Sequence, residues 1–355
     1  MLNKKVLALG ADVKNRFLLA RGKSIHYGPE IGDLSEVANY EVFKKSVNRA
    51  IKRTRPDIIA CDLHPNYFST KFAKELCQLS AVNCEPIQHH HAHIASVIAE
   101  HNLKGPVIGV SFDGTGFGTD GNIWGGEFLI VNRKGFRRLA HLKYHTMPGA
   151  EKVVHEPWRM ALSIVGKKAI SILKGVDKKD KEVVLKMAEK GINSPLTSSA
   201  GRLFDAAAAL LGVCRFASYQ AEGPIKLEAL CDGRVRDSYK VKVKGKDAYI
   251  IDTDPIFDGM LKDIKKGRGN KVIATKFHNS MAGIVISMVK RLSKELRICN
   301  IALSGGVFQN RFLMNRALEG LEKSGLNIFT NKKYSIGDFN IALGQYHVSC
   351  NTSKN

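Results

Sequence analysis

The chain has 355 residues, 44% of them hydrophobic, and a formal net charge of +22, so it holds enough apolar material to bury one large core or two lobes. It contains no run of about 18 apolar residues, and the apolar run near its start soon turns polar, so we expect neither a membrane span nor a secretory signal. Seven scattered cysteines without a CxxC pair argue against a zinc ribbon or a disulfide framework and favour a reducing, cytoplasmic location.

The first hundred residues alternate strand-like and helix-like segments, which favours an α/β architecture. The segments 6–9 and 16–20 have the pattern of two paired strands, with Gly10 at the bend. The next expected elements are a helix over 35–53, a buried strand over 58–61 and a helix over 68–79. A polar linker over 101–105 then predicts an N-terminal lobe of residues 1–105 and a C-terminal lobe of residues 106–355.

The second lobe is expected to start with strands and to continue mainly as helices. Strands are expected over 106–111, 125–131 and 137–143, and helices over 158–165, 183–190, 202–212, 225–230 and 277–296. A late strand over 301–304 runs into a pair of glycines, and a last strand lies near Ile328. Asp338 is expected to open a closing helix.

Four of the twelve histidines lie within the five residues His89-His90-His91-Ala92-His93. On a helix, His89 and His93 are offset by only about 40° and can ligate one ion from one face. Two imidazoles suit zinc, iron(II) or manganese but rarely complete a site, so carboxylates are expected to join them. The alternative is a histidine-rich helix start that is merely solvated or capped.

A glycine-rich turn, Asp113-Gly114-Thr115-Gly116, follows the first strand of the second lobe. Glycines let the backbone approach an anion closely and aim N–H groups at phosphate oxygens. Asp113 could ligate a metal instead of, or as well as, lying beside a phosphate. The alternative is an ordinary glycine hairpin.

Two later segments also suit a nucleotide. Gly305-Gly306 lies between a strand and a helix start, whose free N–H groups can receive a phosphate, and Asn310 follows with a donor and an acceptor. Asp205 begins an alanine-rich helix, where an acid is a poor choice for packing and a ribose hydroxyl could be its partner. The alternatives are a tight strand–helix connection and an acid favoured by the helix dipole.

The positive charge is concentrated in lysine-rich segments over 167–190, 240–246 and 262–271. Such a field attracts polyanions, acidic protein surfaces and nucleotides alike. Solvated surface lysines are the simplest interpretation, and an acidic partner is the next. Nucleic-acid binding is disfavoured, because no aromatic platform or familiar nucleic-acid module accompanies the charge.

Taken together, these segments resemble the carbamoyltransferase domain of the HypF hydrogenase-maturation proteins, which is related to the tRNA threonylcarbamoyltransferase family. The matching segments run in order along the chain, at 7–10 with 14–15, 31–34, 62–65, 88–93, 112–116, 156–160, 198–205, 304–310 and 342–345. The resemblance implies an α/β, two-lobed fold of the actin/hsp70/sugar-kinase (ribonuclease H-like) type, with a nucleotide cleft between the lobes.

The resemblance also implies a site. Metal ligands would be His89, His93, Asp113 and Asp338, and the first three would also be catalytic. Nucleotide contacts would come from Gly114, Thr115, Gly116, Asp205, Gly223, Gly305, Gly306 and Asn310. The cofactors would be a divalent metal, iron or zinc, and an adenine nucleotide as ATP, AMP or carbamoyl-adenylate.

The implied reaction moves a carbamoyl group from carbamoyl-adenylate to a cysteine thiol of a HypE-like acceptor protein and releases AMP, in the maturation of nickel–iron hydrogenase. His64, His90 or His91 could take the thiol proton. Full-length family members carry upstream modules, one of which forms carbamoyl-adenylate, so this chain resembles the transfer module alone. We therefore expect a separate carbamoyl-adenylate-forming partner, and no nucleic-acid or membrane partner.

Three other functions share parts of this pattern. They are a threonylcarbamoyltransferase acting on tRNA, an O-carbamoyltransferase with a small-molecule acceptor, and a non-catalytic nucleotide-binding scaffold. The segments 62–65, 89–91 and 156–160 favour the hydrogenase-maturation branch over the tRNA enzyme.

Overall fold

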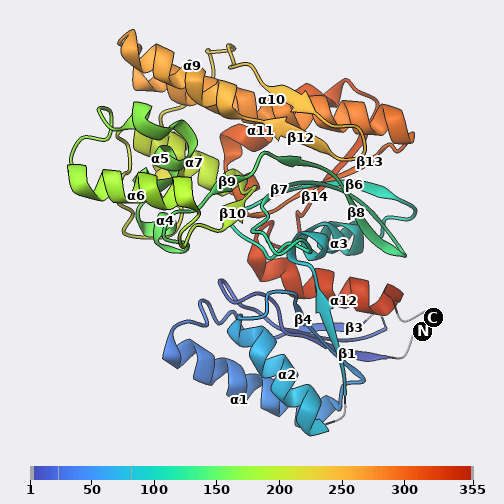
Figure 1. The fold of residues 1–355 in the computed structure, drawn as a ribbon. Helices are drawn as coiled ribbons and strands as arrows, with labels where there is room; N and C mark the ends of the chain where they lie inside the picture. The colour runs from blue at the N-terminus through green and yellow to red at the C-terminus, as the bar shows by residue number, and fades with distance from the viewer. Residues whose placement is uncertain (1–3, 23, 81, 353–355) are drawn as a thin grey trace.

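Two β-sheets lie on either side of a central pair of packed helices, α3 (His89–His101) and α12 (Ile341–Thr352) (Figure 1). The computed structural model describes residues 4–22, 24–80 and 82–352. One sheet has five strands in the order β3-β2-β1-β4-β5, and the other has seven in the order β11-β12-β8-β7-β6-β13-β14. At the helix crossing, a Cβ on Gly344 would overlap the carbonyl of Ala92, so the two backbones need glycine there.

The first sheet is built around the predicted N-terminal hairpin. Its strands are β1 (Lys5–Ala8), β2 (Leu18–Arg21), β3 (Ser24–Tyr27), β4 (Ile58–Asp62) and β5 (Asn83–Ile87). Strand β1 pairs antiparallel with β2 and parallel with β4. The two-residue period of β1 places Leu7 among the side chains of α1 (Val37–Thr54) and α2 (Phe68–Ser80), whereas Ala8 packs against α12.

The second sheet carries the loops that will form the site. Its strands are β6 (Val107–Phe112), β7 (Gly126–Asn132), β8 (Gly135–Leu142), β11 (Lys242–Lys244), β12 (Tyr249–Asp252), β13 (Asn300–Ser304) and β14 (Asn327–Thr330). Strand β6 runs parallel to β13, with Ser111 opposite Ser304. The turns after these two strands therefore leave the sheet side by side. Helix α3 packs on β6 closely enough that a Cβ at Gly109 would overlap Ile94.

Helices dominate the rest of the second lobe, as predicted. They are α4 (Lys152–His155), α5 (Trp158–Val165), η1 (Gly166–Ala169), α6 (Lys178–Lys190), α7 (Ala200–Leu210), α8 (Glu222–Glu228), α9 (Asp254–Lys265), α10 (Asn270–Leu296), η2 (Gly306–Gln309), α11 (Arg311–Glu322) and η3 (Asp338–Asn340). The short strands β9 (His145–Thr146) and β10 (Leu196–Thr197) pair beside them. The alanines of α7 are fully buried, which lets neighbouring helices pack closely around it.

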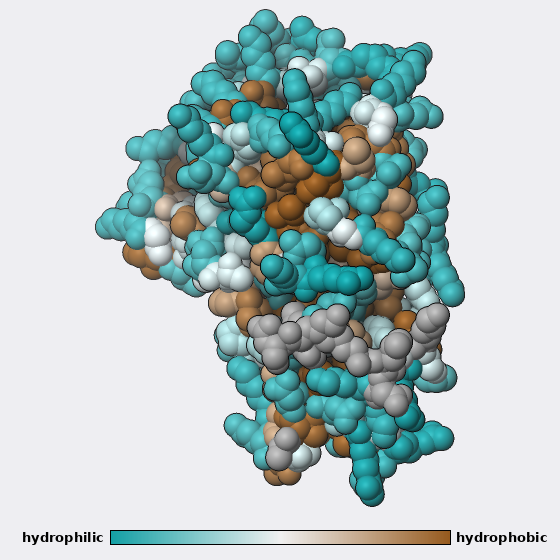
Figure 2. Space-filling view, turned by 90° about the vertical axis from the view of Figure 1, so that its right-hand side faces the viewer, coloured by the Kyte–Doolittle hydropathy of each residue, from teal (hydrophilic) through white to brown (hydrophobic). Residues whose placement is uncertain are grey.

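Among the described helices, only α10 is long and apolar enough to cross a membrane by length and composition. However, 67% of its apolar window is buried within the protein, where Phe277, Met281 and Val285 belong to the main core. This burial is what a core helix requires. On the face that Figure 2 turns to the viewer, hydrophilic residues cover most of the surface and apolar residues gather in the upper half.

Most predicted elements of both lobes are confirmed, although α6 and α10 begin five and seven residues before their expected starts. The elements that were not predicted are α4, α9, η1, β3, β5, β9, β10, β11 and β12. The two sheets lie on either side of the expected boundary at 105/106. Helix α3, expected with the first lobe, packs against β6, β7 and β13 of the second sheet. Helix α12, expected with the second lobe, packs against β1 and β4 of the first sheet. The division of the chain at 105/106 stays a prediction.

Candidate metal centre and nucleotide cleft

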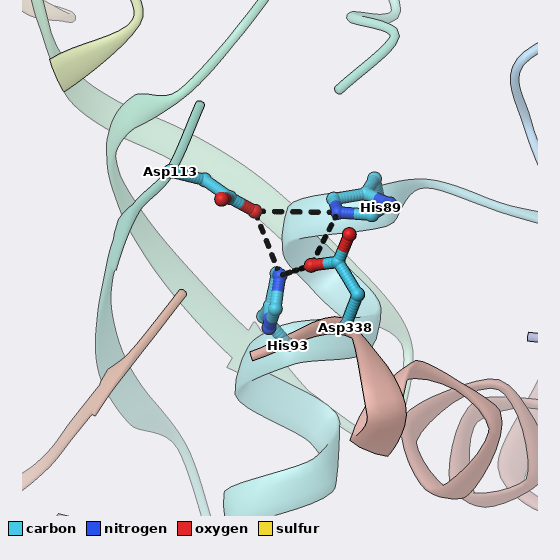
Figure 3. Close-up of side chains that lie close together, drawn as sticks. All are labelled: His89, His93, Asp113 and Asp338. Atoms are coloured by element: carbon cyan, nitrogen blue, oxygen red, sulfur yellow. Dashed lines mark hydrogen bonds and ion pairs between the residues drawn. The ribbon is translucent and has the colours of Figure 1, made fainter. Parts of the chain in front are cut away.

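Two histidines of α3 and two aspartates from distant loops meet at one point. The Nε2 atoms of His89 and His93 lie 3.3 and 2.9 Å from Asp113 Oδ2, and 3.8 and 3.5 Å from Asp338 Oδ1. One ligand atom from each of the four residues lies within 4.8 Å of all the others. Figure 3 shows the four side chains pointing toward one another from α3, the end of β6 and η3.

Each aspartate is placed by its loop. Asp113 follows β6, and its Oδ1 accepts hydrogen bonds from the backbone N–H groups of Gly114 (2.7 Å) and Gly306 (3.2 Å). A Cβ at Gly306 would lie 2.9 Å from the same oxygen, so a side chain there would displace the carboxylate. Asp338 opens η3 directly before α12. The glycine-rich turns thus hold a metal-facing carboxylate in position.

Behind the cluster, a third carboxylate fixes one imidazole. Asp62 ends the fully buried strand β4, and its Oδ2 lies 2.7 Å from His89 Nδ1. This contact orients the ring so that Nε2 faces the cluster, which is a common arrangement around metal-binding histidines. Asp62 was not among the predicted site residues, although a buried strand that runs directly into an acid was a usable signal.

The electrostatics of the cluster favour positive charge between the carboxylates. Burial opposes a charge on His89, but Asp62 and Asp113 outweigh it and hold the pKa of His89 well above its usual range. Hydrogen bonds with the aspartates likewise outweigh burial and raise the pKa of His93. Burial acts against ionisation of Asp113 too, yet the two imidazoles hold its pKa well below normal. Two nitrogens and two carboxylates, mutually close and mostly buried, fit zinc or iron(II) as a donor set.

A cavity of about 440 Å³ opens from the cluster. Asp113 and Asp338 belong both to the cluster and to the cavity wall. The rest of the wall consists of Lys14, Gly114, Gly201, Arg202, Phe204, Tyr219, Gln220, Ala221, Pro224, Ile225, Glu228, Gly306, Val307, Gln309, Asn310 and Gly337. Its volume lies within the roughly 300–1,000 Å³ typical of small-molecule and cofactor sites.

Three of the predicted nucleotide contacts, Gly114, Gly306 and Asn310, line this cavity. The other five lie outside its described wall. Thr115 is exposed, Gly116 packs against the rings of His89 and His90, and Gly305 packs against the backbone of Phe112. Asp205 and Gly223 lie beside each other, and Asp205 is 3% exposed. All eight stay predictions as nucleotide contacts.

Asp205 instead holds an arginine of the cavity wall. Its Oδ2 lies 3.0 Å from Arg202 Nε, but the two groups are misaligned for a hydrogen bond, so the contact is an ion pair only. Burial outweighs this ion pair and raises the pKa of Asp205 to about 6. Arg202 and Lys14 are the cationic residues of the wall. Neither was assigned a role from the sequence, although Lys14 lies in a segment that matches the family.

Asn310 is held by two hydrogen bonds beside a buried histidine. Its Oδ1 accepts from Leu313 N (2.8 Å) and caps α11, so its Nδ2 faces His278 Nε2 at 2.9 Å. Since Nδ2 must donate there, the ring proton of His278 lies on Nδ1, which donates to the carbonyl of Ala274. Cys231 Sγ lies 3.2 Å from the same Nδ1, but this nitrogen already carries a proton and cannot accept the proton of the thiol. Burial also raises the pKa of Cys231 to about 12, so this Cys–His–Asn arrangement does not supply a nucleophile.

The three histidines considered as proton acceptors lie in different surroundings. His91 lines a separate cavity on the other side of α3. His90 is fully buried against Trp124 and Gln88, and its Nε2 has no hydrogen-bond partner among the described residues. The half-buried ring of His64 stacks on Tyr67, and burial lowers the pKa of His64. His64 is thus neutral at pH 7 and partly accessible.

Comparison with known proteins identifies the family. The HypF Kae1-like domain matches residues 2–100, and the second subdomain of the carbamoyltransferase Kae1-like domain matches residues 109–345. A relative from Cupriavidus necator, described as a carbamoyltransferase HypF homolog, is 34% identical over 97% of this chain and 91% of the relative. This chain belongs to the HypF family. The probable carbamoyltransferase HypF of Methanocaldococcus jannaschii is 30% identical over 97% of this chain but only 46% of its own length.

Solved HypF structures confirm the fold. Full-length HypF in a phosphate- and nucleotide-bound form superimposes with a TM-score of 0.95 at 35% identity, over 100% of this chain and 47% of that one. HypF from T. kodakarensis gives a TM-score of 0.89 at 33% identity, over 98% of this chain. The predicted α/β fold of the actin/hsp70 type is therefore confirmed. The chain spans most of the first relative and about half the length of the other HypF proteins it matches.

Proposed function

We propose that this chain is a carbamoyltransferase that moves a carbamoyl group from carbamoyl-adenylate to a cysteine thiol of a HypE-like acceptor during hydrogenase maturation, releasing AMP. The observation that carries the proposal is that Asp113 and Asp338 belong at once to a metal-type cluster and to the wall of a nucleotide-sized cavity. Membership of the HypF family supports the same reaction.

His89, His93, Asp113 and Asp338 would hold a divalent cation, zinc or iron, which as a Lewis acid would polarise an oxygen of the bound substrate. Asp62 would keep His89 in the tautomer that presents Nε2. The buried carboxylates favour positive charge at this position, which a bound cation would supply in place of the imidazole protons. The chain's own contribution is thus a rigid, preorganised set of ligands.

The charge of the adenylate would be met by side chains of the cavity wall. The backbone N–H groups of Gly114 and Gly306, which the sequence pattern offers to phosphate, donate to Asp113. Lys14 and Arg202 are therefore the groups best suited to a phosphate and to the charge that develops as AMP leaves. The buried pairing with Asp205 would hold Arg202 in place.

In the transfer step, the acceptor's sulfur would form a bond to the carbamoyl carbon, and the bond from that carbon to the adenylate oxygen would break. AMP would depart with the bonding electrons, and the thiol proton would pass to a base. Among His64, His90 and His91, His64 is the candidate that is partly accessible and near His89, although its Nδ1 already accepts a hydrogen bond from Asn66 N (3.2 Å). No cysteine of the chain is needed as an intermediate nucleophile. A separate protein would supply carbamoyl-adenylate.

The test is a single-turnover assay with the purified chain, synthetic carbamoyl-adenylate and an acceptor peptide ending in cysteine. AMP release should depend on the thiol, and labelled carbamoyl should appear on the peptide. A double substitution, His89→Ala with His93→Ala, should abolish both, whereas His101→Ala, on the same helix but away from the cluster, should not. Carbamoyl transfer by the double variant would reject the proposal. AMP release at the same rate with and without the acceptor peptide would reject it too.

A further inference from the structure

A second cavity lies across α3 from the metal-type cluster. It has a volume of about 200 Å³ and lies between α3, α12 and the turn joining β7 to β8. At 3.6 residues per turn, His91 points about 200° away from His89 around the helix axis. The body of α3 therefore separates the two sites. In Figure 1 the C-terminal end of α12 lies at the right, on the side that Figure 2 presents.

The polar side chains that line this cavity all carry hydrogen-bond donors, and two of them are cations. Its polar residues are His91, Asn102, Lys104, Asn132, Arg133, His347 and Asn351, and none of the lining residues is acidic. His91 is only 6% exposed, and its ring contacts Phe136. Within the described part of the chain, the rings of His91 and His347 and the cationic groups of Lys104 and Arg133 make no hydrogen bond or ion pair with a protein acceptor.

This grouping favours an anion, because it combines positive charge with hydrogen-bond donors and has no acidic neighbour in the lining. The cationic residues Lys104 and Arg133 are exposed at the mouth of the cavity, whereas His91 is buried. Burial and then the charge of Arg133 lower the pKa of His347 to about 4, which shows that its surroundings resist further positive charge. A bound anion would offset the positive charge of the lining, because each cation and each ring N–H group would gain a hydrogen-bond acceptor.

We propose that this cavity is a binding site for a small oxyanion, held by Arg133 and Lys104 through charge and by His91 and His347 through ring N–H groups. The volume of the cavity limits the size of the anion that can bind. A water molecule occupies roughly 30 Å³ in the liquid, so a tetrahedral oxyanion fits with a few waters. A nucleotide does not fit, since pockets for such ligands start at roughly 300 Å³.

The lining residues come from three elements that an anion in this cavity would connect. Arg133 belongs to the β7–β8 turn, His91 to α3 and His347 to α12. Helix α3 carries two residues of the metal-type cluster, and α12 directly follows the segment that carries a third. A bound oxyanion would therefore link the elements that position the cluster, without touching the cluster itself.

The test is calorimetric titration of the full chain with sodium sulfate at constant ionic strength. We expect one saturable sulfate site that Arg133→Gln weakens at least tenfold. Lys134→Gln is the matched control, because it removes the same charge from the same exposed turn, next to the cavity but outside its lining. His347→Ala should also weaken binding.

Sulfate bound only in the nucleotide cleft would show the same affinity in Arg133→Gln and Lys134→Gln, and that result would overturn the proposal. So would the absence of saturable sulfate binding by the unmodified chain. Both variants lie on an exposed turn and can be checked for unchanged thermal unfolding in chloride. The test measures no transfer activity, so its failure is independent of the proposed carbamoyl transfer.

Discussion

Asp62 Oδ2 lies 2.7 Å from His89 Nδ1, and both side chains are at most 1% exposed. This carboxylate orients the imidazole from behind and does not face the cluster. Replacement of such a second partner typically weakens metal binding 10–100-fold. We therefore expect Asp62→Asn to lower zinc affinity by about that factor, measured by competition with a chromophoric chelator. Asp57→Asn, at the exposed start of the same strand region, is the control and should bind zinc normally.

The two aspartates of the cluster should differ in their effect on folding. Asp113 Oδ1 accepts two backbone hydrogen bonds that join the turns after β6 and β13, whereas the Asp338 side chain is 22% exposed and opens a short helix. Loss of a buried acceptor leaves N–H groups unsatisfied, at about 1–3 kcal/mol. Asp113→Ala should lower the free energy of unfolding by that amount, and Asp338→Ala much less, in urea titrations. Equal losses would contradict this assignment.

Metal uptake should strengthen as pH rises. The carboxylates hold the pKa values of His89 and His93 above their usual range, so protons occupy the imidazoles until a cation displaces them. Zinc affinity should therefore increase between pH 6 and pH 8, with protons released into the buffer on binding. Calorimetry in buffers of different ionisation enthalpy measures this release. Affinity that does not change over this range would show that the imidazoles carry no competing protons.

Asp205 should make folding less favourable as pH rises. Its folded pKa of about 6 lies above the roughly 3.9 of an unfolded aspartate, so the folded state prefers the protonated acid. The stability that this group contributes is present below about pH 4 and is lost as pH rises through 6, by at most about 3 kcal/mol. Asp205→Asn should therefore gain stability relative to the unmodified chain between pH 4 and pH 7 in urea titrations. A constant difference across that range would refute the assigned pKa.

The sequence contained enough local information for the first three cluster residues. The i, i+4 spacing of His89 and His93 places both on one helix face, and a glycine turn after a strand marks Asp113. Asp338 came from family resemblance alone, because only the tertiary packing of η3 against α3 brings it near the histidines. Local patterns contain no such information.

Other features depend on tertiary contacts that no local pattern encodes. Strands β5 and β11 carry few buried apolar residues, so their alternation gave no signal. The position of α12 between the two sheets depends on the helix crossing at Gly344 and Ala92. The expected contact of Asp205 with a ribose stays a prediction, and its place beside Arg202 follows from how α7 is buried.

The most direct test of the four-residue metal centre is metal analysis of the purified chain by mass spectrometry after reconstitution with zinc or, without oxygen, iron(II). We expect one tightly bound cation per chain, none in His89→Ala with His93→Ala, and a large loss in Asp338→Ala, with circular dichroism showing that each metal-free protein is folded. One equivalent of metal retained in the double histidine variant would show that these four residues do not form the metal centre.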